Sequence, residues 1–228
     1  YSLGNELWFF NRPGKAADCY RQAIALSPHF IEAHSQLGKL LTQVGQQDKA
    51  LHVYQNGVER NPENFSLHFL LAEALASQNN YQEAIASYDR CLKINPKSPS
   101  VYFNLAEIYR HQKNWGEAIT NYQKTLQLDL SNWQACFQLA NIWQQQQKYG
   151  KAIQAYDRAI QINPNAIETY LNLGDIFTQQ GNWDKALHNY LKTIQLNSYG
   201  LSFEEKAISR YRKAINNNSK SSAKDHYQ

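Results

Sequence analysis

Apolar residues recur along this chain at the spacing of one helix face, in paired segments that short polar turns separate. One pair predicts a helix over about residues 100–112 and a second helix that begins at Trp115. Lys113-Asn114 lies between them and predicts a tight turn, in which asparagine can adopt a left-handed conformation. The chain therefore predicts an array of short antiparallel helix pairs.

The paired segments repeat every 34 residues, and three positions show this repeat most clearly. A proline or its replacement follows each second helix, an alanine lies inside that helix, and a tyrosine comes four residues after the alanine. Such a period is typical of a stack in which each unit buries its apolar face against its neighbours. The positions are Pro28, Pro62, Pro96, Leu130, Pro164 and Ser198; Ala16, Ala50, Ala84, Ala118, Ala152 and Ala186; and Tyr20, Tyr54, Tyr88, Tyr122, Tyr156 and Tyr190.

A leucine followed by a small residue recurs in each first helix, as at Leu37-Gly38 and Leu173-Gly174. With the alanine, tyrosine and proline positions, this pattern resembles the tetratricopeptide repeat family over about residues 1–200. The resemblance implies an all-α, right-handed superhelical solenoid of antiparallel helix pairs. We expect a partial repeat at 1–30, followed by five repeats at 31–64, 65–98, 99–132, 133–166 and 167–200.

After Ser198 the sequence predicts one amphipathic helix over residues 201–215 and a polar tail over 216–228. Ala207, Tyr211 and Ala214 have the spacing of a second helix, so the first helix of that unit is expected to be missing. The favoured interpretation is a capping helix that covers the last repeat. The alternative is the beginning of a second domain.

Composition limits the possible partners. The net charge is +4, and much of it lies in residues 201–228, so the repeats lack the basic stripe that nucleic-acid binding requires. No apolar run is long enough to span a membrane. Cys19, Cys91 and Cys136 are scattered, which predicts neither disulfides nor a metal site and favours the cytoplasm. We expect no nucleic acid, membrane, metal or cofactor as ligand.

The chain has no methionine and begins in mid-helix, which predicts a piece of a longer protein.

No catalytic motif occurs in the sequence, so we expect that the chain is not an enzyme. His34 and His68 occupy the same repeat position and are predicted to be packed helix residues. The tyrosines that follow the alanines, and the aromatic residues that begin the second helices, are predicted to be core. The latter series is Tyr81, Trp115, Tyr149 and Trp183.

In the family, the first helices of successive repeats line a concave groove that holds extended ligands. Carried over position by position, the resemblance gives a candidate peptide-binding groove. Its apolar members are three phenylalanines and a leucine, and its polar members are amides, carboxylates and one arginine. The candidates are Phe69, Glu73, Phe103, Asn104, Glu107, Arg110, Phe137, Gln138, Asn141, Leu171, Asn172 and Asp175.

These positions predict a protein–protein interaction scaffold that binds a peptide or protein segment. Glu73, Glu107 and Asp175 favour a basic or neutral segment over an acidic one. Glu107 argues against capture of a C-terminal carboxylate, as in chaperone-binding members of the family. The amides Asn104, Gln138 and Asn172 are similar to the substrate-binding ladder of O-linked N-acetylglucosamine transferases. The alternative is therefore a substrate-recognition arm of a longer enzyme of that kind.

The N-terminal edge carries four consecutive large apolar residues, Leu7, Trp8, Phe9 and Phe10. One helix face cannot bury all four. The sequence therefore predicts an exposed apolar edge through which the chain could self-associate.

Overall fold

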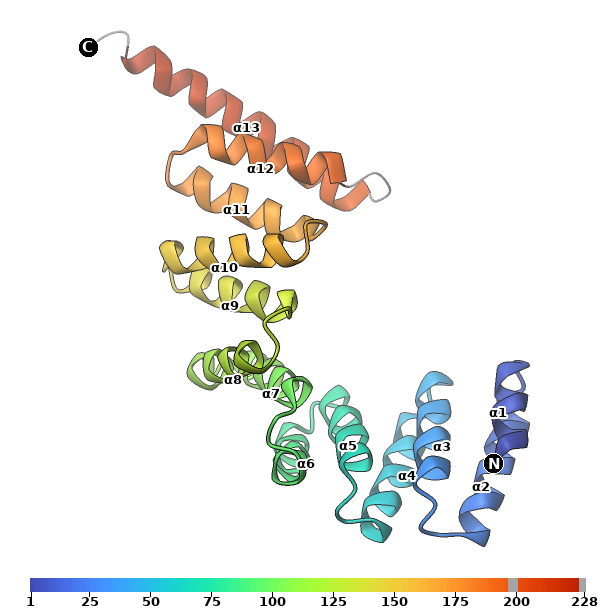
Figure 1. Cartoon of the computed structure of the whole chain (residues 1–228). Coiled ribbons are helices and arrows are strands. Elements are labelled where there is room, and N and C mark those ends of the chain that lie inside the picture. The colour runs from blue at the N-terminus through green and yellow to red at the C-terminus, as the bar shows by residue number, and fades with distance from the viewer. Residues whose placement is uncertain (197–200, 226–228) are drawn as a thin grey trace. The chain divides into compact units, whose positions relative to one another are not determined.

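The computed structural model describes residues 1–196 and 201–225, which form thirteen α-helices and no strand (Figure 1). Residues 197–200, where the last predicted repeat ends, and residues 226–228 of the predicted tail lie outside the described residues. The helices are α1 (Ser2–Phe9), α2 (Pro13–Leu26), α3 (Ile31–Gln43), α4 (Gln47–Arg60), α5 (Phe65–Ser77), α6 (Tyr81–Ile94), α7 (Pro99–His111), α8 (Trp115–Leu128), α9 (Trp133–Gln145), α10 (Tyr149–Ile162), α11 (Ile167–Gln179), α12 (Trp183–Leu196) and α13 (Leu201–Asp225).

The helix boundaries follow the 34-residue repeat. The first helices α3, α5, α7, α9 and α11 begin 34 residues apart, and the second helices from α2 to α12 do the same. The helix predicted over 100–112 is α7, and α8 begins at Trp115 as predicted. The all-α fold of paired helices is thus confirmed.

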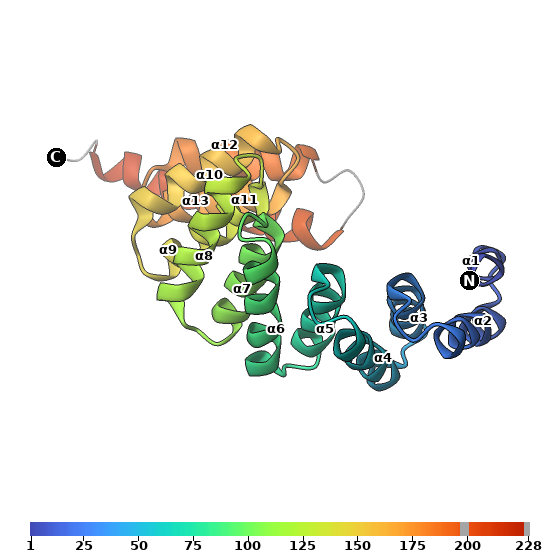
Figure 2. The same ribbon diagram turned by 60° about the horizontal axis from the view of Figure 1, so that its bottom comes forward.

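The chain forms two compact units, Tyr1–Asn121 and Tyr122–Gln228. In the first unit, α3 packs on α4 and α5 packs on α6, while α4 also contacts α5 and α6 contacts α7 (Figure 2). In the second unit, α9 pairs with α10 and α11 pairs with α12, while α10 contacts α11. The second helices α4 and α10 therefore each pack between two first helices, and α6 does the same, which is how a repeat stack buries its apolar faces.

The alanine and tyrosine positions of the repeat form the centre of each helix pair. All six alanines and all six tyrosines are at most 2% exposed. The small alanine lets two helices approach closely, and the tyrosine ring fills the layer beside it. These tyrosines are core residues by their rings, as predicted.

Two glycines are required by these tyrosines. A Cβ added at Gly38 would overlap the ring of Tyr54, and one added at Gly174 would overlap the ring of Tyr190. A Cβ added at Gly150, by contrast, has no neighbouring atom within 4 Å. The helix pairs at Gly38 and Gly174 are therefore packed too closely for any side chain at these positions.

We expect Gly38→Ala to lower the free energy of unfolding by about 1–3 kcal/mol, because the methyl group must displace the Tyr54 ring. Gly150→Ala is the control, and it should raise stability by up to about 1 kcal/mol through helix propensity alone. Urea unfolding measures both variants. Equal stabilisation by the two would contradict the close packing of Gly38 on Tyr54.

The turn between the helices of each pair has one left-handed residue, at the same repeat position throughout. Between α7 and α8 this residue is Lys113, with φ 58°, and not Asn114 as the sequence suggested. Its N–H donates to the carbonyl of Arg110, and the N–H of Asn114 donates to Tyr109, which closes the helix end. The full series is Asn11, Gly45, Asn79, Lys113, Gln147 and Gly181.

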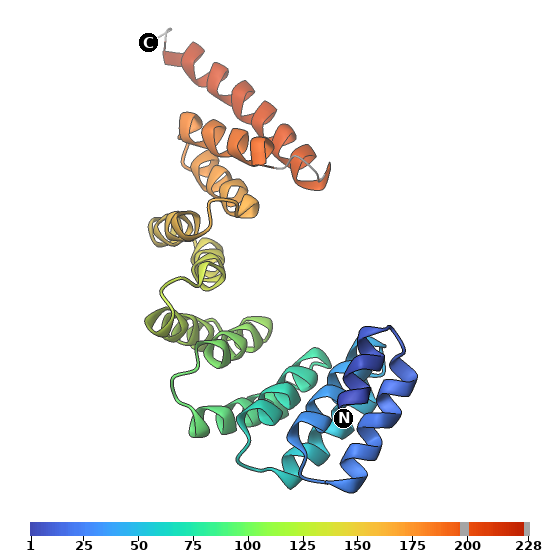
Figure 3. The ribbon, with the colours of Figure 1, turned by 45° about the vertical axis from the view of Figure 1, so that its right-hand side comes forward.

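Helix α13 differs from its prediction in position and length. It begins at Leu201, 34 residues after α11, and packs along α12 with further contacts to α11 (Figure 3). It therefore lies where the first helix of a following repeat is expected, and no first helix is missing before it. It continues to Asp225, ten residues beyond the predicted 201–215, because no glycine or proline interrupts it.

The buried face of α13 is narrow and is formed by small residues and one aromatic ring. Ala207 and Ala214 are fully buried, and Tyr211 packs beside them against Tyr190 and Ala186 of α12. Ile215, which follows Ala214 directly, is 42% exposed. The small alanines allow α13 to approach α12 closely.

The N-terminal edge is apolar and partly exposed. Phe9 and Phe10 are 85% and 70% exposed, whereas Leu7 and Trp8 pack against the core of the first unit. The Trp8 ring meets Tyr20 edge-on, with centroids 6.4 Å apart. Self-association through this edge stays a prediction.

Candidate functional site

The first helices of the first unit position six of the candidate residues, on α5 and α7. Phe69 is not a free anchor: its ring stacks on Phe65 at 6.0 Å and meets Tyr88 edge-on at 5.7 Å. Phe103 is partly buried. The polar candidates lie together and form a pocket, described next.

Glu73, Asn104 and Glu107 line one pocket of about 470 Å³, which we call the acidic pocket. It lies among α5, α6 and α7. Carboxylates from two consecutive first helices thus face one space. Its other lining residues are Ala76, Ser77, Asn79, Tyr81, Tyr88, Ile108 and His111.

Tyr88 and Asn104 organise the polar wall of the acidic pocket. The Asn104 amide donates to the Tyr88 hydroxyl at 2.9 Å and also hydrogen-bonds to the Glu73 side chain. The Tyr88 ring is buried, and burial raises the pKa of its hydroxyl. The hydroxyl therefore stays protonated and fixes the amide that faces Glu73.

The two carboxylates differ in their surroundings. Burial raises the pKa of Glu73, while the Asn104 hydrogen bond and the positive charge of Lys39 act in the opposite direction. Glu107 forms an ion pair with Arg110, with nitrogen–oxygen distances of 2.7 and 3.2 Å to one carboxylate oxygen. Burial therefore disfavours the charged form of Glu73, whereas Glu107 has Arg110 as its partner. A cation in the pocket would stabilise the charged form of Glu73.

Two rings lie at the edge of the acidic pocket. The Tyr81 ring stacks on the imidazole of His111, with centroids 6.4 Å apart and an interplanar angle of 16°. Tyr81 was predicted to be core. It does pack against the core of the first unit, but it also lines the pocket.

In the second unit, two candidate residues are core residues. Phe137 is 9% exposed and packs against Trp133 and Tyr156. Leu171 is 4% exposed and belongs to the cluster that includes Ala207 of α13. Neither presents a side chain to solvent, because neighbouring helices cover them.

The amide candidates of the second unit form a network around Tyr156. The Tyr156 hydroxyl lies 2.5 Å from Oδ1 of Asn141 and 2.7 Å from Oε1 of Gln144, and it accepts from Asn172 at 3.2 Å. Asn172 also donates to Asn141 at 3.1 Å, and Asn141 donates to Gln138 at 3.2 Å. The structure therefore brings Gln138, Asn141 and Asn172 together, as a connected set.

Asp175, the remaining carboxylate, is occupied by α13. Arg210 donates to Asp175 at 2.6 Å, and the Tyr190 hydroxyl donates to the other carboxylate oxygen at 2.9 Å. Burial raises the pKa of Asp175, and the Tyr190 hydrogen bond and the Arg210 charge oppose that rise. Asp175 thus serves the attachment of α13 in this structure.

The hydroxyls of the repeat tyrosines are the functional groups that the sequence interpretation missed. Tyr88, Tyr156 and Tyr190 each connect a buried ring to a polar candidate residue on a first helix. The signal was available in the sequence, since tyrosine and not phenylalanine fills all six positions. A core position that never loses its hydroxyl indicates a hydrogen bond at its far end.

His34 and His68 are packed helix residues, as predicted. Both are buried, and their Nε2 atoms lie 2.9 and 2.8 Å from the carbonyls of Pro28 and Pro62. Within the described residues, no group of three or more His, Cys, Asp or Glu side chains has the arrangement of a metal site. In the same part of the chain, every helix is too short or too polar to cross a membrane.

Comparisons with known proteins agree with this architecture. Models of the tetratricopeptide repeat match residues 1–30, 35–99 and 133–198, and the model of anaphase-promoting complex, cyclosome, subunit 3 matches residues 77–159. The search of curated proteins gave no significant match.

Three solved structures illustrate the likeness. PilF of Pseudomonas aeruginosa has a TM-score of 0.74 and 19% identity, over 91% of this chain and 95% of that one. YrrB, described as a TPR protein with an unusual peptide-binding site, has a TM-score of 0.66 and 16% identity, over 85% and 99%. MamA has a TM-score of 0.67 and 18% identity, over 71% and 95%. At these identities the likeness shows the fold alone. With its 34-residue helix pairs and the three matches along its length, the chain belongs to the tetratricopeptide repeat family.

Proposed function

We propose that this chain is a non-catalytic scaffold that binds a protein or peptide segment, and that the acidic pocket receives a basic side chain of that segment. The acidic pocket carries the proposal, because Glu73 and Glu107 of consecutive repeats face one space of about 470 Å³. Asn104 beside them can donate to and accept from a peptide backbone. YrrB, which has the same fold, is described as having a peptide-binding site, in agreement with this role.

The occupant is inferred from charge and size. Glu107 already has Arg110 as a partner, whereas the raised pKa of Glu73 reflects a carboxylate that burial disfavours. A lysine or arginine side chain supplies a compact or planar cation with several N–H donors. Such a group would offset the cost of burying the Glu73 charge. An acidic side chain would meet repulsion at the same place.

The test uses two fluorescein-labelled nonapeptides of Gly, Ser and Leu that differ only in a central Lys or Glu. We expect the Lys peptide to bind more tightly in fluorescence anisotropy, and Glu73→Gln to weaken it by about tenfold, the scale of one charge-assisted hydrogen bond. Glu83→Gln on α6 is the matched control, because Glu83 does not line the pocket. Equal binding of both peptides, or an unchanged preference in Glu73→Gln, would reject the proposal.

The same substitution should separate binding from stability. Since the folded-state pKa of Glu73 is raised, the folded chain holds the proton more tightly, and the contribution of Glu73 to stability falls as pH rises through that pKa. Above it, the charged carboxylate costs stability. We therefore expect Glu73→Gln to be at least as stable as the natural chain at pH 7, and equal to it at acid pH. Urea unfolding at the two pH values measures this, and a large loss of stability at pH 7 would contradict it.

A further inference from the structure

A second cavity lies in the second unit, away from the acidic pocket and lined by other residues. It is a cleft of about 760 Å³ between the end of α8 and α10, over α9, and we call it the α8–α10 cleft. Its floor is apolar: Leu126, Cys136, Leu139 and Ala155 are each at most 9% exposed. Its rim is polar and basic, with three glutamines, Lys151 and Arg158.

The cleft arises where this repeat departs from the others. At the position of Cys136, the other four complete repeats hold a histidine or tyrosine, whose ring nitrogen or hydroxyl hydrogen-bonds to the carbonyl of the preceding loop proline. Cys136 is too small to make this contact, and the loop proline is replaced by Leu130, which is 71% exposed. The four hydrogen bonds are His34–Pro28 at 2.9 Å, His68–Pro62 at 2.8 Å, Tyr102–Pro96 at 3.2 Å and Tyr170–Pro164 at 3.2 Å.

The corresponding place in the first unit provides a direct comparison. There, His34, Pro28 and Val53 line a cavity of about 360 Å³, half the volume of the α8–α10 cleft. The two larger side chains, His34 and Val53, correspond by the 34-residue repeat to Cys136 and Ala155. The extra space is therefore produced by two shortened side chains in one repeat interface.

The charge of the cleft also departs from the repeat. Arg90, which occupies the position of Arg158 in an earlier repeat, forms an ion pair with Glu63 at 2.5 Å. The residue that corresponds to Glu63 is Ser131, so Arg158 has lost its carboxylate and donates to the Leu130 carbonyl at 3.4 Å.

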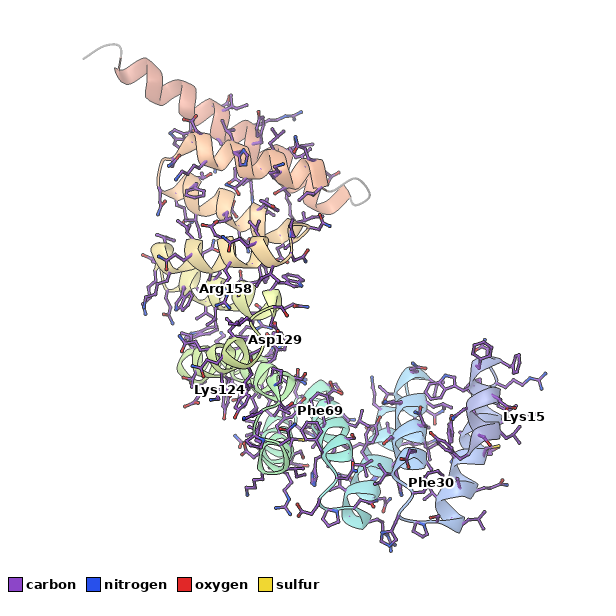
Figure 4. All side chains as sticks on the ribbon, viewed as in Figure 1. Lys15, Phe30, Phe69, Lys124, Asp129 and Arg158 are labelled. Atoms are coloured by element: carbon purple, nitrogen blue, oxygen red, sulfur yellow. The ribbon has the colours of Figure 1, made fainter. Side chains whose placement is uncertain are left out.

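The nearest loop carboxylate does not replace the lost partner. Asp129 accepts hydrogen bonds from the backbone N–H and the hydroxyl of Ser131, at 3.0 and 2.6 Å. Figure 4 shows Asp129 in the loop after α8 and Arg158 on α10, and no ion pair joins Arg158 to a carboxylate within the described residues. The lining of the cleft holds two cations and no acid.

We propose that the α8–α10 cleft binds a short acidic peptide segment that inserts one large apolar side chain. The apolar floor accepts that side chain, and each such burial is a favourable transfer from water. Arg158 and Lys151 at the rim pair with flanking carboxylates of the segment, and the rim glutamines can hydrogen-bond to its backbone. The occupant is thus opposite in charge to the one proposed for the acidic pocket. The two sites share no lining residue, so each proposal is tested independently of the other.

The probe is the capped hexapeptide Asp-Glu-Leu-Phe-Glu-Asp, compared with its charge-reversed form Lys-Arg-Leu-Phe-Arg-Lys. Binding is followed by NMR through the five tryptophan indole N–H signals, because Trp143 lines the cleft and the other four do not. We expect the acidic peptide to shift the Trp143 signal selectively. Arg158→Ala should weaken that binding by about tenfold, as expected for loss of one charge-assisted contact.

The most specific variant restores the repeat pattern. Cys136→Tyr introduces the residue that Tyr102 and Tyr170 provide in neighbouring repeats, so it should fill the cleft without unfolding the chain. We expect it to abolish the Trp143 shift and to leave the other four indole signals in place. Arg90→Ala, the equivalent change at the paired arginine, should leave peptide binding unaltered.

Several results would overturn the inference. They are an unmoved Trp143 signal at millimolar acidic peptide, equal binding of the charge-reversed peptide, and undiminished binding by Cys136→Tyr. Should Cys136→Tyr fail to fold, Ala155→Val, which matches Val53 in the first unit, narrows the cleft in its place and must weaken binding.

Discussion

Deletion of residues 201–228 is expected to destabilise α11 and α12 by about 3–6 kcal/mol. The figure counts the two large side chains that lose their cover, Tyr190 and Leu171, at roughly 1.5–3 kcal/mol each. The deletion removes α13, whose Ala207 and Ala214 are buried against α12 and whose Tyr211 packs in the same cluster. It uncovers the side of Tyr190 and Leu171 that α13 covers. In a stack where each helix pair depends on its neighbours, the end that loses its cover opens first.

Hydrogen exchange measures this result repeat by repeat. Amides of 167–196 should exchange faster after the deletion, while those of 65–111 should not change, because the latter belong to the first unit. Deletion of 218–228 alone is the control, and it should leave the exchange rates of the 167–196 amides as they are in the natural chain. If the longer deletion leaves exchange in 167–196 unchanged, α13 does not stabilise the last repeat.

One substitution separates the ion pair from the apolar contact. Asp175 accepts from Arg210 at 2.6 Å, and burial already raises the pKa of that carboxyl. Arg210→Ala leaves a partly buried carboxylate without its cation, so exchange in α11 should rise moderately and less than after the deletion.

The 34-residue repeat made the helices, their boundaries and the buried alanine and tyrosine positions predictable from sequence. These features depend on a local pattern of residues that recurs in every repeat. The left-handed residue was misplaced at Asn114 because asparagine adopts this conformation more readily than lysine does. The position is fixed instead by where the first helix ends, and that places it one residue earlier, at Lys113.

The candidate site was less predictable, because it depends on contacts between repeats. Phe137 and Leu171 fit the family pattern of groove positions, yet packing of adjacent helices buries both. Asp175 was expected to face a ligand, and α13 supplies Arg210 to it instead. Helix α13 was assigned to the wrong repeat position because Ala207, Tyr211 and Ala214 have the second-helix spacing, although the helix begins where a first helix is expected. Sequence periodicity alone does not distinguish these two alignments.

Substitution of Tyr156 is expected to have a large effect on the stability of the second unit. The ring is fully buried, so Tyr156→Ala should cost about 3–5 kcal/mol of unfolding free energy, as for other large-to-small changes at core aromatics. Tyr156→Phe retains the ring and removes the hydroxyl that contacts Asn141, Gln144 and Asn172. We expect it to cost about 1–3 kcal/mol, since the partners lose a hydrogen bond in a part-buried place.

The control is Tyr170→Phe, which removes a hydroxyl whose hydrogen bond to the Pro164 carbonyl is exposed and 3.2 Å long. Its cost should be under about 0.5 kcal/mol, within the range of ordinary surface changes. Thermal unfolding of the three variants ranks them. If Tyr156→Phe is as harmless as Tyr170→Phe, the amide network does not depend on the tyrosine hydroxyl.

Alkaline pH gives the hydroxyl a second, independent signature. Burial raises the pKa of Tyr156 above its ordinary value, so the unfolded chain loses this proton at a lower pH than the folded chain does. The contribution to stability is therefore full below the ordinary tyrosine pKa of about 10 and is lost as pH rises from there toward the folded-state pKa. Tyr156→Phe has no proton to lose at this position, so its deficit relative to the natural chain should shrink as pH rises above about 10. A deficit that stays constant between neutral and alkaline pH would mean that the hydroxyl titrates alike in both states, and that its burial has no energetic consequence.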